Sequence, residues 1–93
     1  MSEDDASEEL IADVGRRIAE VREQGGWTQQ EAAEILGMPL KNLQWYEQGA
    51  NMTLRTLSRI ATGLGVPVRK FFDQPKTKGR RAKGRPKKNA ATR

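Results

Sequence analysis

Residues 28–49 read TQQEAAEILGMPLKNLQWYEQG, and this stretch has the signals of two short helices joined by a tight turn. Thr28 and Glu31 have the spacing of a capping box, in which each side chain accepts a hydrogen bond from the other residue's backbone amide. Gly37 can adopt the left-handed conformation that ends a helix. Pro39 can occupy the first position of a second helix, where its missing N–H is not needed.

Each of these two predicted helices has one face suited to a core. In the first helix, apolar residues recur at helical spacing at Ala32, Ile35 and Leu36. The small Ala33 should lie where the two helices cross. In the second helix, Leu43 and Tyr46 should point inward, and Gly49 should end the helix. The outward face of the second helix should carry Lys41, Asn42, Gln44, Trp45 and Gln48. A glycine turn between two helices, the second polar on its outer face, is typical of a helix-turn-helix.

The run WTQQEAAEILGMPLKNLQWYEQG resembles the phage-repressor and Cro helix-turn-helix family, with its T-Q-x-E-x-A segment, its glycine in mid-motif and its terminal E-x-G. The similarity extends from about Val14 to Phe72, roughly two thirds of the chain. The resemblance implies an all-α, compact five-helix domain that binds double-stranded operator DNA, usually as a homodimer. From this resemblance we expect a small bacterial or phage transcription regulator that acts as a repressor.

The resemblance assigns roles to seven positions. Base-contacting positions of the family fall on Leu40, Lys41 and Trp45, with Gln44 beside them. Gln29 matches the glutamine that holds a phosphate and braces the reading helix. Asn42 and Gln48 match phosphate-contacting positions. The chemistry fits this assignment, because a lysine can donate to guanine O6 and N7 and a glutamine can pair with adenine.

Two of these positions have an open alternative, and two features depart from the family pattern. Leu40 and Trp45 could pack on a thymine methyl group, or could instead form a protein contact or part of the core. Pro39 stands where the family often has a serine or threonine cap. The loop of residues 50–52 lacks the basic residues common there, so the domain alone should hold phosphates weakly.

The residues on either side of the motif predict three further helices. A first helix with an apolar stripe should end before the glycine pair at 25–26, and the stripe comprises Leu10, Val14, Ile18 and Val21. Arg16 and Arg17 should point outward, either as solvated charges or as phosphate contacts. Trp27 should staple the second helix to the core. A fourth helix follows the Thr53 cap, with its inward face at Leu54, Leu57, Ile60, Ala61 and Leu64.

A last short helix should open at Pro67. It carries three apolar residues, Val68, Phe71 and Phe72. We expect one phenylalanine to close the core and the other to remain exposed, where it could pair with a second copy of the chain.

The charges are concentrated at the two ends of the 93-residue chain. Residues 1–13 carry six acidic groups, and residues 75–93 carry nine basic groups and no acidic one. We expect residues 1–9 to be a disordered acidic arm, residues 10–73 to be the folded domain, and residues 74–93 to be a disordered basic tail. This asymmetry favours nucleic acid as a partner.

Within the tail, residues 83–88 read KGRPKK and resemble an AT-hook, whose core is Gly-Arg-Pro between basic residues. Glycine lets the backbone approach the groove floor, and proline holds the strand extended. The arginine would enter the narrow minor groove of A·T tracts. The alternative is a polybasic tail that binds phosphates without preference. The candidate residues in the tail are Arg80, Arg81, Lys83, Gly84, Arg85, Pro86, Lys87 and Lys88.

Composition argues against catalysis and against several other classes of function. The chain has no cysteine and no histidine, which removes sulfur metal ligands, thiol nucleophiles and the commonest general base. We therefore expect no enzyme activity, no metal and no cofactor. No apolar run approaches a membrane span and no signal-peptide pattern is present, so we expect a cytoplasmic protein. Two alternatives stay open: an antitoxin-type module that binds a protein toxin, and an architectural protein that binds DNA with little sequence preference.

Overall fold

The computed structural model describes residues 3–77, and this part of the chain consists of helices and their connections, with no strand. In chain order the helices are α1 (Glu3–Gln24), α2 (Gln29–Leu36), α3 (Leu40–Glu47), α4 (Leu54–Leu64) and a 3-10 helix, η1 (Val68–Phe72). The expected all-α fold is confirmed. The fifth expected helix is present only as the short 3-10 helix η1, because a single helical turn follows Pro67 before the chain becomes extended at Asp73.

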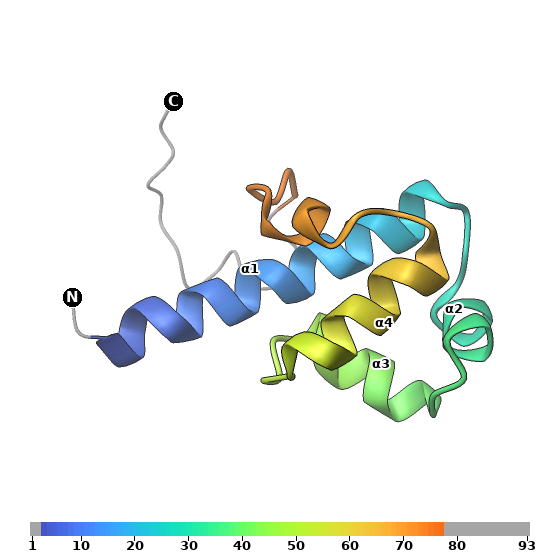
Figure 1. Ribbon diagram of the computed structural model, residues 1–93, viewed down its shortest axis with the longest axis horizontal. Helices are drawn as coiled ribbons and strands as arrows, with labels where there is room; N and C mark the ends of the chain where they lie inside the picture. The colour runs from blue at the N-terminus through green and yellow to red at the C-terminus, as the bar shows by residue number, and fades with distance from the viewer. Residues whose placement is uncertain (1–2, 78–93) are drawn as a thin grey trace.

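The core lies between the five described helices, and α2 contributes Ala32, Ala33 and Leu36 to it. Its largest fully buried side chains come one each from α1, α3, α4 and η1: Ile18, Leu43, Ile60 and Phe71. Phe72 is 49% exposed, so one phenylalanine of η1 closes the core and the other does not, as expected. Figure 1 shows α1 running across the molecule, with α3 on the far side of α4 from η1. α2 and α3 are therefore held against a continuous apolar core.

The start of α1 differs from the expectation. The helix begins at Glu3, whereas the sequence predicts a disordered arm up to residue 9. Acidic side chains near the first turn interact favourably with the helix dipole, and alanine and glutamate favour helix without any apolar stripe. This end of α1 extends beyond the other helices (Figure 1), and Leu10 is therefore 51% exposed although it continues the apolar stripe.

Two other residues expected in the core are also exposed. Ile35 is 48% exposed on α2 and Leu54 is 75% exposed on α4, whereas their neighbours Ala33, Leu36 and Leu57 are buried. Helical periodicity identifies the correct helices, but the buried face that it predicts for each is wider than the buried face in the structure. Short helices of a small domain bury a narrow stripe, because few elements cover them.

The helix ends follow the predicted chemistry. Thr28 and Glu31 form both hydrogen bonds of the capping box, and Gly37 ends α2 in the left-handed conformation with φ 67°. Thr53 caps α4 through the Thr56 amide. Pro39 is the N-cap of α3 rather than its first helical residue, and its side chain makes no capping hydrogen bond. Among residues 3–77, no helix is long and apolar enough to cross a membrane.

Candidate nucleic-acid interface

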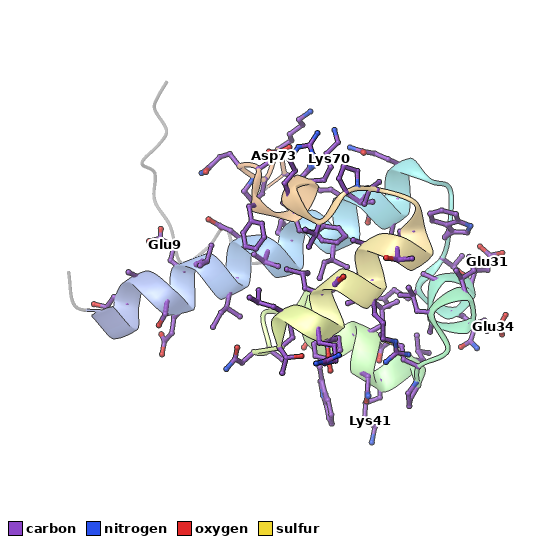
Figure 2. The ribbon with its side chains drawn as sticks, viewed as in Figure 1. Glu9, Glu31, Glu34, Lys41, Lys70 and Asp73 are labelled. Atoms are coloured by element: carbon purple, nitrogen blue, oxygen red, sulfur yellow. The ribbon has the colours of Figure 1, made fainter. Side chains whose placement is uncertain are left out.

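The outer face of α3 carries the exposed candidates. Lys41, Trp45 and Gln48 are exposed, and Trp45 has 53% of its surface accessible. The Lys41 ammonium lies 5.6 Å from the centre of the Trp45 ring, within the range of a cation–π interaction. Figure 2 shows Lys41 pointing away from the body of the molecule, on the side opposite Lys70. α3 thus presents a cation and an aromatic ring together to solvent.

The remaining α3 candidates are partly buried. Leu40 packs against the apolar core, which favours the core alternative over a purely outward role for this residue. Asn42 lies in the first turn, where its backbone N–H donates to the Pro39 carbonyl at 3.0 Å. Trp27, the expected staple, also packs against the core beside α2. The structure therefore divides the predicted set into exposed and partly buried residues.

A buried ion pair joins the end of α1 to the end of α3. Arg22 Nε donates to Glu47 Oε2 at 2.6 Å, and Arg22 Nη2 donates to Glu47 Oε1 at 3.2 Å. The side chains are 10% and 6% exposed, respectively. A third donor of the same guanidinium, Nη1, binds the carbonyl of Trp27 at 2.8 Å. This two-point contact fixes the position of α3 against α1, because a planar guanidinium and a carboxylate bind in one orientation.

Gln29 contacts α3 at two residues. Its Nε2 donates to Glu47 Oε1 at 2.9 Å, and its Oε1 accepts from Gln44 Nε2 at 3.3 Å. Gln29 stands at the first position of α2, so these two contacts join the start of α2 to the middle and end of α3. The bracing contact that the family resemblance implies is therefore present, whereas a phosphate contact by Gln29 stays a prediction. Lys41 and Trp45 lie outside this network.

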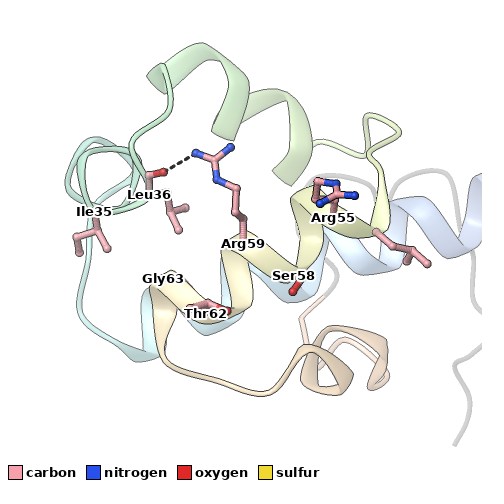
Figure 3. A pocket seen from close by; sticks show the side chains of 8 residues that line it. Ile35, Leu36, Arg55, Ser58, Arg59, Thr62 and Gly63 are labelled. Atoms are coloured by element: carbon pink, nitrogen blue, oxygen red, sulfur yellow. Dashed lines mark hydrogen bonds between the residues drawn. The ribbon is translucent and has the colours of Figure 1, made fainter.

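The other end of α2 is held by α4. Arg59 Nη2 donates to the carbonyl of Leu36 at 3.0 Å, which satisfies a carbonyl in the last turn of α2 (Figure 3). The same figure shows a groove between α2 and α4, into which Arg55 and Ser58 also face. Gly63 keeps this crossing close, since a Cβ there would overlap with Leu36 Cδ2.

Arg17 is not the outward charge that the sequence predicts. It is 3% exposed, and its Nη1 donates to Glu20 Oε1 at 2.8 Å while its Nε donates to the Lys70 carbonyl at 3.0 Å. Position 17 lies three residues after Val14 and four before Val21, so it shares their buried face. Arg17 therefore ties α1 to η1 and does not contribute to the outer surface of the domain.

The chain after η1 returns to α1. Thr77 donates its amide and its hydroxyl to Glu20 Oε2 at 2.5 and 2.7 Å, and its hydroxyl accepts from Arg16 Nε at 2.9 Å. Burial alone would raise the pKa of the Glu20 carboxyl, but hydrogen bonds from Thr77 and Arg17 outweigh it and hold this pKa below its usual value. Arg16 is accordingly engaged at its Nε.

The tail candidates lie outside the described residues, which end at Thr77. The AT-hook resemblance of residues 83–88, together with the remaining tail candidates Arg80 and Arg81, therefore stays a prediction from sequence.

Sequence reasoning missed several residues on which the geometry of the interface depends. Arg22 and Glu47 form the ion pair behind α3, and Gly15 allows α1 to approach it. The glutamate is visible as part of the terminal E-x-G pattern, but its partner is 25 residues away in the sequence. A contact of this kind requires knowledge of the helix packing.

Comparisons with known proteins agree on the kind of domain. A helix-turn-helix domain model matches residues 13–70. A protein of Pyrococcus furiosus named as a putative HTH-type transcriptional regulatory protein, PF1851, is 33% identical over 64 residues, which cover 69% of this chain and 18% of that protein. The HTH-type transcriptional regulator PuuR of Escherichia coli is 31% identical over 62 residues, covering 66% of this chain and 34% of that one. The matched segment thus spans less than half the length of each of these curated relatives.

A solved structure has a similar fold. The restriction-modification controller protein C.AhdI from Aeromonas hydrophila superposes with a TM-score of 0.63 and 27% sequence identity. The matched region covers 67% of this chain and 96% of that one. In contrast to the curated relatives, this similarity extends over almost the whole of the other protein.

Proposed function

The chain belongs to the helix-turn-helix domain family, and from this premise we propose that it is a sequence-specific DNA-binding transcription regulator, acting as a repressor. It would work by equilibrium binding, occupying a promoter and excluding other proteins from it. Its partner is double-stranded DNA, with α3 in the major groove.

The observation that carries this proposal is the exposed Lys41–Trp45 pair on a helix that is held at its end and along its side. A lysine ammonium can donate to guanine O6 and N7, and an indole ring can pack on a thymine methyl group. α3 is held by the Arg22–Glu47 ion pair at its end and by Gln29 along its side. Rigid support matters because base readout depends on placing donors within hydrogen-bond distance of the base edges.

The proposal is tested by selecting bound sequences from random DNA and then measuring affinities of variants for the selected site. Lys41→Ala should lower specific affinity by roughly 1–3 kcal/mol and leave binding to random DNA nearly unchanged. Lys70→Ala is the matched control, because it removes the same charge from an exposed position on the opposite side of the molecule (Figure 2). Equal losses for Lys41→Ala on selected and random DNA would rule out base readout by this residue.

The same measurement separates the architectural alternative. A protein that binds DNA without sequence preference would give a ratio of specific to nonspecific affinity near one and no enriched site. A regulator should give a ratio of about 10³ or more. A ratio near one would therefore contradict the proposed regulator and support an architectural role.

We also propose that the regulator binds as a homodimer. Three large apolar side chains with high exposure, Leu10, Leu54 and Phe72, line one groove together with Met52. Apolar surface gathered in this way is typical of a protein interface. The sequence predicts a pairing surface around η1 alone, whereas this groove also involves α1 and the start of α4.

Dimerisation is tested by sedimentation of Leu54→Lys beside the unaltered protein. Because Leu54 is 75% exposed, a lysine there should leave the fold intact while it disrupts an apolar interface. The variant should sediment as a monomer and footprint more weakly on a two-half-site operator, whose half-sites lie about one helical turn apart. If the unaltered protein is already a monomer at the concentrations at which it binds DNA, the homodimer proposal is wrong.

The basic tail is proposed as a second DNA contact. Residues 83–88 have the composition of a minor-groove hook, in which Arg85 would enter the narrow groove of A·T tracts. The tail would supply positive charge that the domain lacks beside α3, since residues 50–52 have no basic side chain. The alternative is a polybasic tail that binds phosphates. It differs from a hook only because it would not prefer DNA flanked by A·T tracts.

A further inference from the structure

The polar contacts behind α3 form a chain with a fixed direction. Gln44 donates to Gln29, Gln29 donates to Glu47, and Glu47 also accepts from Arg22. We call the three residues Gln44, Gln29 and Glu47 the glutamine relay. The relay passes from a buried carboxylate at the end of α3 to a half-buried glutamine on the same helix, by way of the first residue of α2.

The carboxylate determines the direction of every hydrogen bond in the relay. Both carboxylate oxygens of Glu47 accept hydrogen bonds from the Arg22 guanidinium, and a carboxylate in such an ion pair has no hydrogen to donate. Gln29 must therefore turn its NH₂ group toward Glu47, because the reverse orientation would place two acceptor oxygens against each other. Its carbonyl oxygen is then on the other side and faces Gln44, which must donate to it.

This constraint determines what Gln44 has left for a ligand. Its contact with Gln29 uses one of its two N–H groups. Within the described part of the chain, its carbonyl oxygen and its second N–H remain available. In a primary amide these two groups can form one edge, an acceptor beside a donor. Adenine offers the complementary edge in the major groove, N6–H beside N7.

Building on the proposed function, we propose that the glutamine relay sets the base specificity of Gln44 for adenine. Glu47 and Gln29 act as positioning residues, and neither needs to touch the base. Guanine presents two acceptors, O6 and N7, and would require Gln44 to turn two donors outward. Such a rotation would give up the hydrogen bond to Gln29 and leave the Gln29 carbonyl unpaired. The relay thus discriminates against guanine at this base pair, while Lys41 stays free to select guanine at another.

The test measures base preference and uses the operator selected by the unaltered protein. Gln44→Ala first identifies the base pair whose preference this residue determines. Affinities are then compared for the four base pairs at that position. The unaltered protein should prefer adenine to guanine there by about tenfold or more, the discrimination that a good bidentate contact provides.

Gln29→Met removes both hydrogen-bonding groups from the middle of the relay while keeping a side chain of similar length. The adenine-to-guanine ratio at the Gln44 position should fall to within about threefold of one, and the preference that depends on Lys41 should be unchanged. Gln30→Met is the matched control: Gln30 is exposed on the same helix, where it donates to Glu34. A purely structural role of Gln29 would weaken binding to all sequences in proportion and leave the ratio intact.

A charge-swapped variant tests the direction of the relay. In Gln29→Glu/Glu47→Gln, residue 29 becomes a pure acceptor that still faces Gln44, so Gln44 must still donate to it. The adenine preference should be retained within about threefold. Thermal unfolding shows whether Gln29→Met folds. If it does not, the charge-swapped variant still tests whether the relay determines the adenine preference.

The possible outcomes separate this inference from the proposed function. If the unaltered protein selects no sequence, the proposed function fails. If it selects an operator but no position depends on Gln44, the relay has no role in specificity. An adenine preference that survives Gln29→Met, or one that disappears in the charge-swapped variant while that variant folds, would likewise overturn the inference.

Discussion

Three charged residues of α1 are buried: Arg17, Glu20 and Arg22. Charged side chains are rarely buried unless they are paired, and each of these has a partner of opposite charge. Their partners lie on η1, on α3 and in the segment after η1, as well as on α1 itself. These residues hold the elements in place, and their roles follow from partners far away in the sequence.

Acid should weaken the contact between Glu20 and Thr77. The folded state holds the pKa of Glu20 below its usual value, so the carboxylate contributes stability above the pKa of the unfolded chain, about 4.3. That contribution disappears as the pH falls from there through the folded pKa. Thermal unfolding between pH 7 and pH 3 should therefore show a steeper decline for the unaltered protein than for Glu20→Gln.

Glu23→Gln is the control for this comparison, because Glu23 lies on the same helix with a side chain that is 54% exposed. It should change the pH dependence far less than Glu20→Gln does. Identical pH profiles for the unaltered protein and Glu20→Gln would show that the Thr77 and Arg17 contacts do not stabilise the ionised form. Glu20→Gln should also be less stable at neutral pH, since it removes the closer carboxylate partner of the buried Arg17 and leaves only Asp73, whose Oδ2 lies 3.7 Å from Arg17 Nη2.

Individual residues are predictable where their role depends on local sequence. Lys41 and Trp45 are exposed on α3, and Gln48 is exposed at its C-cap, as helical periodicity predicts. The prediction for Arg17 is wrong because it follows from the charge, whereas the position in the apolar stripe decides the burial. Which of these residues bind DNA stays a prediction. The structure gives only their exposure and their hydrogen bonds within the protein, and neither identifies a contact to a base or a phosphate.

At the scale of the helices, a single glycine controls the approach of α1 to the end of α3. Gly15 lies in α1, and a Cβ at this position would overlap with the carbonyl oxygen of Tyr46 and lie 3.1 Å from that of Glu47. These are backbone atoms, which cannot move aside as a flexible side chain can. A glycine is therefore required here by packing, although its backbone conformation is helical.

Gly15→Ala should destabilise the domain even though alanine favours helix by about 1 kcal/mol relative to glycine. The clash with the α3 backbone should outweigh that gain, with a net decrease of about 1–3 kcal/mol in the free energy of unfolding. Denaturant unfolding monitored by far-UV circular dichroism provides the measurement. Ala12→Gly is a useful companion, because it introduces mainly the helix-propensity effect in the same helix. A Gly15→Ala variant as stable as the unaltered protein would show that α1 and α3 can separate without cost.

The limits of α2 and α4 are predictable because their caps are local. Thr28, Gly37, Thr53 and Gly65 each act within a few residues of their own helix end. The start of α1 is not predictable in this way, because the first residues have no apolar periodicity and only favourable helix chemistry. The Gly15 contact is equally invisible in the sequence, since it depends on α3 crossing α1 at that point.

At the scale of the whole molecule, the described chain ends against α1. Thr77 is joined to Glu20 and Arg16, so the basic tail starts from the α1 side of the domain, while the exposed candidates lie on α3. From residue 78 to Arg85 the tail has eight residues, which span at most about 26–29 Å when fully extended. The domain measures 36 × 26 × 23 Å along its principal axes. The segment from residue 78 to Arg85 is therefore at most about as long as the two shorter dimensions of the domain, so the proposed hook would reach DNA close to the domain.

Deleting residues 78–93 should weaken DNA binding broadly while it leaves the fold unchanged. The cut falls after Thr77, so the hydrogen bonds to Glu20 are kept, and eight of the nine basic residues in 75–93 are removed because Lys76 remains. For every phosphate that the shortened chain no longer binds, the slope of log affinity against log salt should fall by about 0.9. Titrations between about 50 and 200 mM salt measure that slope.

The same titrations distinguish a hook from a polybasic tail when the operator is flanked by either A·T or G·C tracts. An arginine in the minor groove is attracted by the narrow, strongly negative groove of A·T tracts, whereas phosphates carry the same charge in any sequence. A hook therefore predicts a larger decrease in affinity on A·T flanks, and Arg85→Ala alone should remove most of that difference. Arg80→Ala, which removes the same charge five residues earlier, should reduce affinity equally on both flanks. If Arg85→Ala and Arg80→Ala behave alike, the tail binds through its charge alone, and base preference belongs only to α3.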